Sequence, residues 1–269
     1  MEAVDVSVFS LSLALFFTAV FISKKPFKNY PPNMESKRSR LDRFISKQIG
    51  INRRDVRLML AQKRILLDGQ PATDINQPVD EFTHIQLDQQ VLQNNTPVYL
   101  MLHKPIGVVT AVKDDQHKTV IDLIDHEQKN QLHHVGRLDL NTSGLLLLTN
   151  DGRWSKRLTG PEHHVTKRYH VTLAKPVTEE YVRVFKQGIY FAYEDATTRP
   201  AELEILNDFE AIISLTEGRY HQIKRMFGHF RNEVVKLHRL SVGDLKLDAN
   251  LLPGEHRLLN GDEVEALSE

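Results

Sequence analysis

The sequence lacks cysteine, and this absence excludes disulfide bonds, thiolate metal sites and cysteine nucleophiles. The same absence favours a cytoplasmic location. The chain of 269 residues also has no net charge, and its 41% hydrophobic and 26% charged residues exclude a disordered or fibrous protein. It contains no internal repeat and no glycine-rich loop for phosphate. Its length is sufficient for two domains, each with its own core.

The neutral total hides a basic segment near the amino terminus. Between Met34 and Ala72, ten lysine and arginine residues stand against four aspartate and glutamate residues. Such a cluster fits a surface that binds a polyanion, and it fits a merely solvated helix face about equally well. Charge alone leaves both interpretations open.

An apolar run precedes the basic segment. Residues 6–22 carry no charge, and the length of this run is at the lower limit for a membrane-spanning helix. Three lysines follow it. The run is a poor signal peptide because acidic residues precede it and no small-residue cleavage pattern follows it. We expect Met34 to be the true start and residues 1–33 to come from an overextended reading frame. A membrane anchor with its amino end outside is the alternative.

Residues 34–90 are predicted to form one small domain of two helices and a hairpin. Apolar residues recur at helical spacing in SRLDRFISKQI and in NRRDVRLMLAQKRI, and Asn52 caps the second stretch. These apolar positions are Leu41, Phe44, Ile45 and Ile49, then Val56, Leu60 and Ile65. The stretch ILLDGQPA predicts a tight turn at Asp68 and Gly69, and THIQLD predicts a final strand.

A basic helix pair followed by a tight hairpin resembles the alpha-L RNA-binding module of a ribosomal protein and several RNA-modifying enzymes. The resemblance implies that basic side chains of this domain contact RNA phosphates, which position the RNA without reading its sequence. These candidates are Arg43, Lys47, Arg53, Arg54, Arg57 and Lys63.

The rest of the chain is predicted to form a second domain. Residues 91–97 are polar and have no hydrophobic period, so we expect a linker there. In residues 98–269, VYLMLHKP, KRYHVTLAKP and EAIISLTEG predict strands, whereas RYHQIKRMFGHF and the threonine-capped TEEYVRVFKQG predict helices. This alternation indicates a mixed alpha/beta domain around a sheet.

One carboxylate stands out in GRLDLNTSGLLLLTNDG, residues 136–152. Asp139 precedes four leucines that predict a buried strand, where an unpaired charge would be costly. Asp139 is therefore either a turn-former or a working group. Asn141, Thr142 and Ser143 could already form the turn, but the spacing alone leaves both interpretations open.

This stretch, followed in order by KRYHV, EGRYHQIKRMF and LHRLSVG, resembles the pseudouridine synthases of the ribosomal small-subunit type. The match extends to DGRWSKRLTGPEHH and LLPGEHRLL and covers nearly everything from Ser36 onward. The resemblance implies an α+β fold, in which the alpha-L domain precedes a catalytic domain with a curved, mixed, mainly antiparallel sheet flanked by helices. It implies a central cleft in which Asp139 is the nucleophile, attacking the sugar or assisting elimination to a glycal.

The resemblance assigns roles to four further residues. Lys224, in HQIKRM, replaces the arginine of other pseudouridine synthase families and would keep the aspartate ionised, although without an arginine's bidentate fork. Its alternative is an exposed basic residue, as for Arg225. Tyr169 would stack on the target base and assist proton removal, and Leu237 would line the pocket. A core position is the alternative for both.

Arg137 resembles the residue that fills the gap left by a flipped base or holds the flanking strand, and a surface salt bridge is the alternative. The pairs His133–His134 and His163–His164 are poorly arranged for one ion, because adjacent residues on a strand point to opposite faces. We expect no metal site, and contacts of these histidines with solvent or RNA. The reaction needs no cofactor, and none is expected.

The resemblance therefore implies a monomeric, cytoplasmic enzyme that converts one uridine of small-subunit (16S) ribosomal RNA to pseudouridine, on a partly assembled subunit. A sister enzyme for large-subunit (23S) ribosomal RNA and a noncatalytic RNA-binding assembly factor of the same fold remain alternatives. A glycosidase is disfavoured because the motif offers no second carboxylate.

Overall fold

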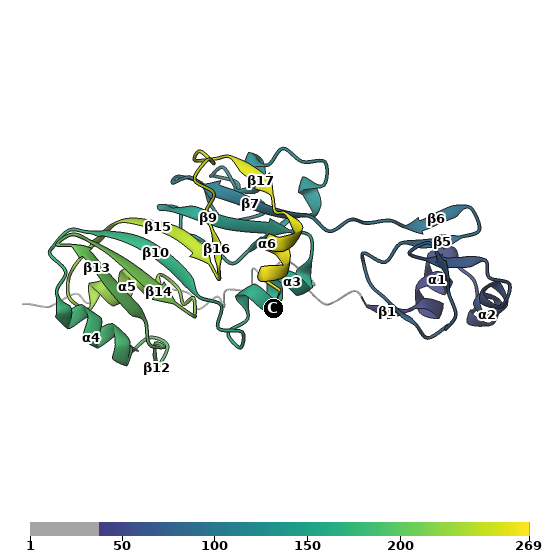
Figure 1. The fold of residues 1–269 in the computed structure, drawn as a ribbon, viewed down its shortest axis with the longest axis horizontal. Helices are drawn as coiled ribbons and strands as arrows, with labels where there is room; N and C mark the ends of the chain where they lie inside the picture. Colours follow the sequence, from purple (N-terminus) through teal and green to yellow (C-terminus); the bar gives the residue numbers. More distant parts are fainter. Residues whose placement is uncertain (1–37, 269) are drawn as a thin grey trace, which may run out of the picture. The chain divides into compact units, whose positions relative to one another are not determined.

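The structure, a computed structural model, describes residues 38–268, so the expectations for residues 1–33 lie outside it (Figure 1). The described residues form an α+β fold, as the resemblance implied. The helices are α1 (Leu41–Ile49), α2 (Arg53–Ala61), α3 (Gly152–Thr159), α4 (Glu179–Gln187), α5 (Gln222–Gly228) and α6 (Gly261–Ala266), with short 3-10 turns at Ile121–Leu123 and Lys129–Gln131.

The short strands of the amino-terminal part are β1 (Ser39–Arg40), β2 (Ile65–Leu67), β3 (Gln70–Pro71), β4 (Pro78–Val79), β5 (Ile85–Leu87) and β6 (Gln90–Gln93). The remaining strands are β7 (Tyr99–Lys104), β8 (His133–Val135), β9 (Thr142–Thr149), β10 (Lys167–Leu173), β11 (Tyr190–Phe191), β12 (Ala196–Thr197), β13 (Glu202–Asn207), β14 (Glu210–Leu215), β15 (Val234–Val242), β16 (Leu245–Lys246) and β17 (His256–Leu258).

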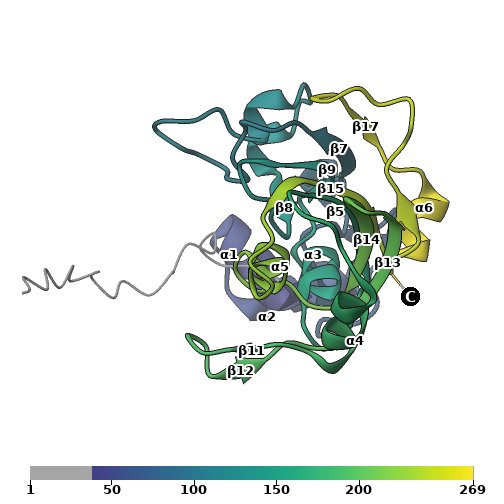
Figure 2. The same cartoon turned by 90° about the vertical axis from the view of Figure 1, so that its left-hand side faces the viewer.

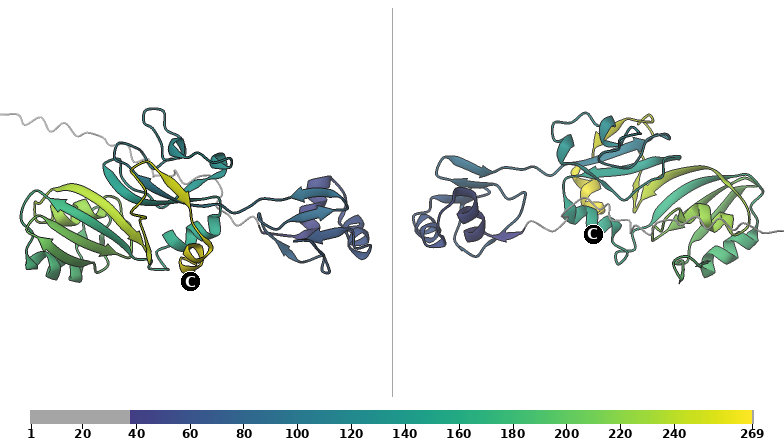
Figure 3. Two further views of the ribbon diagram at one scale, coloured as in Figure 1. Left: turned by 45° about the horizontal axis from the view of Figure 1, so that its top comes forward. Right: turned by 180° about the vertical axis from the view of Figure 1, so that it is seen from behind.

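The amino-terminal module, residues 39–93, packs α1 and α2 against short strands and has a core of its own (Figure 3). Its sequence explains its local structure. The Asn52 side chain accepts a hydrogen bond from the Asp55 N–H, so the predicted helix cap is confirmed. Asp68 and Gly69 both have positive φ, as the predicted tight turn between β2 and β3 requires.

Three details of this module differ from the sequence predictions. Ile65 lies in β2 rather than on α2, because the helix ends at Ala61. The strand in THIQLD is not the last, since Asp88 takes a positive φ and the chain returns as β6 against β5. The linker predicted at residues 91–97 is therefore shorter, because its first three residues belong to β6 and Leu92 packs against the module's core.

The second part of the chain is built on one large mixed sheet. Among the described residues, nine strands form it, with the main order β13-β14-β10-β15-β9-β7-β17 and with β16 and β8 pairing β15 and β9. The pair β15 and β9 is parallel, and the other pairs are antiparallel. Figure 2 shows that β15, β14 and β13 follow a curve with α5 inside it. The expected curved, mainly antiparallel sheet is confirmed.

Successive residues of a strand point to opposite sides, so a strand that is apolar throughout gives the sheet two apolar faces. Helices cover both of them. Leu146 and Leu148 of β9 belong to the core beneath α4 and α5. Leu145 and Leu147 belong to the core on the other face, with Trp154 of α3. The run of four leucines thus serves two cores, as expected for a central buried strand.

Two local expectations need correction. Thr178 precedes α4, but its side chain makes no capping hydrogen bond. Thr142 and Ser143, which were predicted to be turn residues, already belong to β9, where they pair with β15. Within residues 38–268, no helix combines the length and the apolar character that crossing a bilayer requires.

Candidate active site

The loop that carries Asp139 is fixed from two sides. Thr110 Oγ1 donates to the carbonyl oxygen of Leu138 at 2.7 Å and also accepts from the Leu138 N–H at 3.2 Å. The Gly107 N–H donates to the carbonyl oxygen of Leu140 at 2.9 Å. The residues before and after Asp139 are therefore held by backbone contacts, so the carboxylate stands on a rigid support.

A buried lysine completes this support. Lys104, at the end of β7, is fully buried, and its Nζ donates to the carbonyl oxygens of Asp139 at 3.1 Å and Thr142 at 2.9 Å. Burial lowers the pKa of Lys104 to about 8, and the Asp139 charge opposes this shift. The ammonium group contacts the Asp139 backbone rather than its carboxylate, so Lys104 shapes the loop and adds positive potential behind it.

The Asp139 carboxylate does not cap the turn that follows it. The Thr142 N–H donates to the backbone carbonyl of Asp139 at 3.0 Å, so the turn is closed without the side chain. The carboxylate faces α5 instead: Oδ2 lies 3.3 Å from Lys224 Nζ and Oδ1 lies 3.4 Å from His221 Nε2. The turn-cap interpretation therefore fails, and the carboxylate is held by two side chains across the site.

The neighbours of α5 explain why Lys224, and not Arg225, faces Asp139. The Arg225 guanidinium forms two hydrogen bonds with the Glu194 carboxylate, at 2.7 and 3.1 Å, and stacks on Phe191 at 3.6 Å. The start of the helix is held by Gln222, which donates to Glu217 at 2.7 Å. These contacts fix the rotation of α5 so that Lys224 points to the aspartate.

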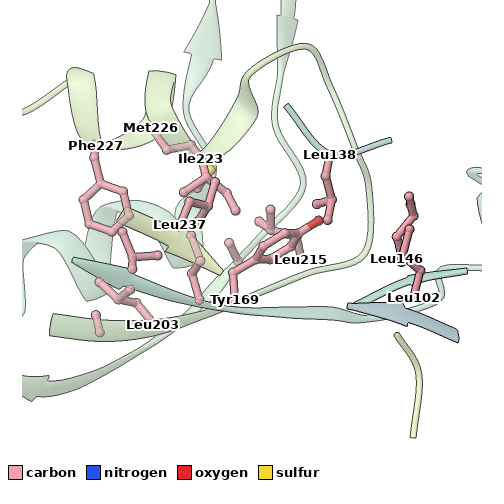
Figure 4. Packing of buried hydrophobic residues seen from close by; sticks show 14 of the residues in the cluster. Leu102, Leu138, Leu146, Tyr169, Leu203, Leu215, Ile223, Met226, Phe227 and Leu237 are labelled. Atoms are coloured by element: carbon pink, nitrogen blue, oxygen red, sulfur yellow. The ribbon is translucent and has the colours of Figure 1, made fainter. Parts of the chain in front are cut away.

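Tyr169 and Leu237 lie on the adjacent strands β10 and β15, in the same apolar core (Figure 4). Tyr169 of β10 is 9% exposed and Leu237 of β15 is 7% exposed, and both belong to the core that includes Ile223 of α5. Figure 4 shows the Tyr169 ring beside Leu215, with its oxygen directed towards Leu138. Both residues are core residues by burial, and Leu138, which joins this core, directly precedes Asp139.

Arg137 is exposed two residues before Asp139, and no ion pair holds it among residues 38–268. The salt-bridge alternative therefore has no support there, and the side chain is available to RNA. The six basic candidates of the amino-terminal module are also exposed. One of them, Arg53, lies 3.8 Å from the buried Asp42, so part of its charge is used within the module.

The histidine pairs differ from each other. His163 and His164 are exposed, as expected. His133 and His134 are instead partly buried, and burial lowers the pKa of both, to about 4 for His133. They therefore belong to the packing around β8 rather than to a solvent or RNA surface. Within the described part of the chain, no three histidine, aspartate or glutamate side chains converge as a metal site would require.

Three residues near the site were not predicted from the sequence: Lys104, His221 and Arg239. A signal existed for two of them, since Lys104 ends the apolar strand VYLMLHKP and Arg239 lies inside the strand that carries Leu237. A lysine or arginine within a buried strand is rare unless its charge is paired, so this position marks both residues as candidates for a specific role. His221 has no such signal, because its contact with Asp139 depends on the fold.

The geometry can support chemistry at a carbon bound to a good leaving group. An accessible carboxylate, 33% exposed, faces a cation at 3.3 Å, and the core that contains the Tyr169 phenol extends to Leu138, the residue before the carboxylate. A carboxylate that is accessible and held in this way can act as a nucleophile.

Comparisons with known proteins agree with this arrangement. A family model described as RNA pseudouridylate synthase matches residues 98–229. A solved structure titled as a pseudouridylate synthase superimposes with a TM-score of 0.63 and 40% identity, covering 85% of this chain and 99% of that one. The chain belongs to the RNA pseudouridine synthase family.

Within the family, its relatives include proteins named ribosomal small subunit pseudouridine synthase A. The one from Pseudomonas aeruginosa is 46% identical over 226 residues, covering 84% of this chain and 98% of the relative. The one from Escherichia coli strain K12 is 39% identical over 229 residues, covering 85% and 99%.

Proposed function

We propose that this chain converts a uridine of small-subunit ribosomal RNA to pseudouridine, with Asp139 as the nucleophile. The proposal depends on one observation: the Asp139 carboxylate does not cap the turn that follows it, and it pairs with Lys224 at 3.3 Å. The choice of small-subunit RNA is supported by relatives of that name that match nearly their whole length.

The reaction breaks the bond between N1 of uracil and C1′ of ribose and forms a bond between C5 and C1′. The proton on C5 is lost to a base, and N1 gains a proton, so the product is an isomer of the substrate. Asp139 either attacks C1′ or removes a sugar proton to give a glycal. Lys224 holds the Asp139 carboxylate in place through the ion pair, and Tyr169 and Leu237 hold the detached base by stacking and apolar contact.

The amino-terminal module supplies affinity in this proposal. Its exposed cations contact RNA phosphates: Arg43, Lys47, Arg54, Arg57 and Lys63, with Arg53 in part. Arg137 holds the strand next to the flipped base. The natural substrate is a partly assembled small subunit in the cytoplasm, and the enzyme acts as a monomer. The relatives are named for the ribosomal small subunit, which supports a ribosomal substrate.

Pseudouridine mapping tests the function. The protein should introduce pseudouridine at one position of small-subunit ribosomal RNA in vitro, and a strain that lacks it should lose that position only. Loss of a large-subunit position, with the small subunit still modified, would contradict the proposed substrate. RNA binding without any pseudouridine formation would support the noncatalytic assembly factor instead.

A further inference from the structure

Arg239 is a buried cation next to the candidate site. It lies on β15, is 3% exposed, and has Tyr169 of β10 and Gly144 of β9 as its pairing partners. Its Nε donates to the carbonyl oxygen of Leu145 at 2.6 Å, whereas its Nη2 is buried without a hydrogen-bond partner. No carboxylate among residues 38–268 forms an ion pair with it.

This position is unfavourable for stability alone. A guanidinium stays protonated, so burial cannot neutralise it, and a buried charge without a partner is costly. Its surroundings are also positive, because Arg239 contributes, after burial itself, to lowering the pKa of Lys167 to about 8. It acts in the same direction on Lys104, where Asp139 opposes it. A methionine would fill this volume without these costs.

The guanidinium lies beside the hydroxyl end of Tyr169. Arg239 Nη1 is 3.5 Å from the phenol oxygen, and the guanidinium carbon is 6.0 Å from the ring centroid. A guanidinium has donors only, so the phenol oxygen must accept in this contact, and its own hydrogen points elsewhere. Figure 4 shows this oxygen on the side of Leu138, the residue before Asp139.

Close packing of the strands fixes the place of Arg239. Gly144 has a positive φ, and a Cβ built on it would come within 2.3 Å of the Arg239 carbonyl oxygen. β9 and β15 therefore approach more closely at this point than any larger residue allows. This close approach fixes the Arg239 backbone, and the hydrogen bond from Nε to the Leu145 carbonyl oxygen holds the guanidinium beside Tyr169.

We propose that Arg239 is a positioning residue that makes the Tyr169 hydroxyl a hydrogen-bond donor to the departing uracil. The inference rests on the proposed function. When the bond between N1 and C1′ breaks, its electron pair stays with the base, and the negative charge spreads to the carbonyl oxygens of uracil. A phenol O–H polarised by a buried guanidinium stabilises this anion without transferring a proton in that step.

Substitution of Arg239 tests this role. In Arg239→Met and Arg239→Gln, kcat on the RNA substrate should fall about 10- to 100-fold, with KM nearly unchanged, because the lost stabilisation belongs to the transition state. The melting temperature should change little, since an unpaired buried charge is removed. Arg239→Lys should restore part of kcat. Arg183→Met, on the exposed side of α4, removes a charge of the same kind and should leave kcat unchanged.

Two further measurements separate positioning from a structural role. In a Tyr169→Phe background, Arg239→Met should cause little additional loss, because the guanidinium acts through the hydroxyl. The second measurement uses RNA in which 5-fluorouridine replaces the target uridine. The single-turnover rate at which the 5-fluorouridine is consumed should fall less in Arg239→Met than the rate on uridine does, because fluorine stabilises the anion of the departing base. Unchanged kcat in the folded Arg239 variants, additive losses with Tyr169→Phe, or an equal defect on both substrates would overturn the inference. Absence of pseudouridine with the unaltered protein would instead overturn the proposed function.

Discussion

Lys224 Nζ lies 3.3 Å from Oδ2 of Asp139, and the other carboxylate oxygen lies 3.4 Å from His221 Nε2. His221 is the residue directly before α5 and Lys224 lies in the first turn of that helix, so neighbouring positions of one segment supply both contacts. The Asp139 backbone is held separately by Lys104. Its side chain and its main chain thus have independent supports, and substitutions can test them one at a time.

Asp139→Asn should abolish turnover while leaving the fold and RNA binding intact. Asparagine keeps the shape of the side chain but removes the charge that acts at the sugar. Binding should survive because most of its free energy comes from phosphate contacts. Thermal melting, RNA affinity and pseudouridine formation on a small-subunit RNA fragment measure the three properties. A folded variant that binds RNA and has near-normal activity would refute the catalytic assignment.

Lys224→Met should lower kcat by about 100-fold, because an electrostatic partner of this kind typically contributes two to three powers of ten. Lys224→Arg should recover part of the activity, since the charge returns with a different geometry. Lys186→Met, at an exposed position of α4, serves as the matched control. Rates are measured under single turnover. If Lys224→Met and the control Lys186→Met lose equal activity, the Asp139–Lys224 pair has no special role.

Substitution of the basic module should change the salt dependence of RNA binding. Arg54 and Arg57 are exposed on α2, so the double alanine variant should reduce the slope of log K against log salt by about 0.7 to 0.9 for each phosphate that it no longer neutralises. Arg64→Ala is the control, because its guanidinium is already paired with Asp88 at 2.7 Å. Binding is measured between low and high salt. An unchanged slope in the double variant would mean that these residues only decorate a solvated face.

Stability should fall at mildly acidic pH because of His133. Burial lowers the pKa of His133 to about 4 in the folded protein, whereas the unfolded value is about 6.5. Above pH 6.5 the residue is neutral in both states and contributes nothing to the pH dependence. Between pH 6.5 and 4 the unfolded state binds a proton that the folded state does not. The free energy of unfolding therefore decreases as the pH is lowered through this range, by at most about 3 kcal/mol.

Denaturant titrations of the unaltered protein and of His133→Gln at pH 7, 6 and 5 measure this effect. The variant should lose less stability between pH 7 and 5 than the unaltered protein does. His163→Gln, at an exposed position, should follow the unaltered protein. Parallel curves for His133→Gln and the unaltered protein would show that His133 titrates alike in both states.

The sequence by itself determined the local structure and the position of the nucleophile candidate. The periods of the two first helices, the Asn52 cap and the Asp68–Gly69 turn depend on neighbours within a few residues, and the structure confirms them. The ordered motifs identified the family. Where local patterns compete, the sequence was less accurate, as at Gln90–Gln93, whose pairing with β5 a polar composition does not show.

Only the tertiary structure decided which charges meet Asp139. Lys224 and Arg225 are neighbours with the same charge, and Glu194, 31 positions before Arg225, engages the arginine and leaves the lysine to the aspartate. The sequence places Lys104 and Arg239 in strands, but their contacts arise only where β7, β9, β10 and β15 come together around them. The physical reason is that electrostatic energies depend on distance and burial, and between residues far apart in the chain these are set by the fold.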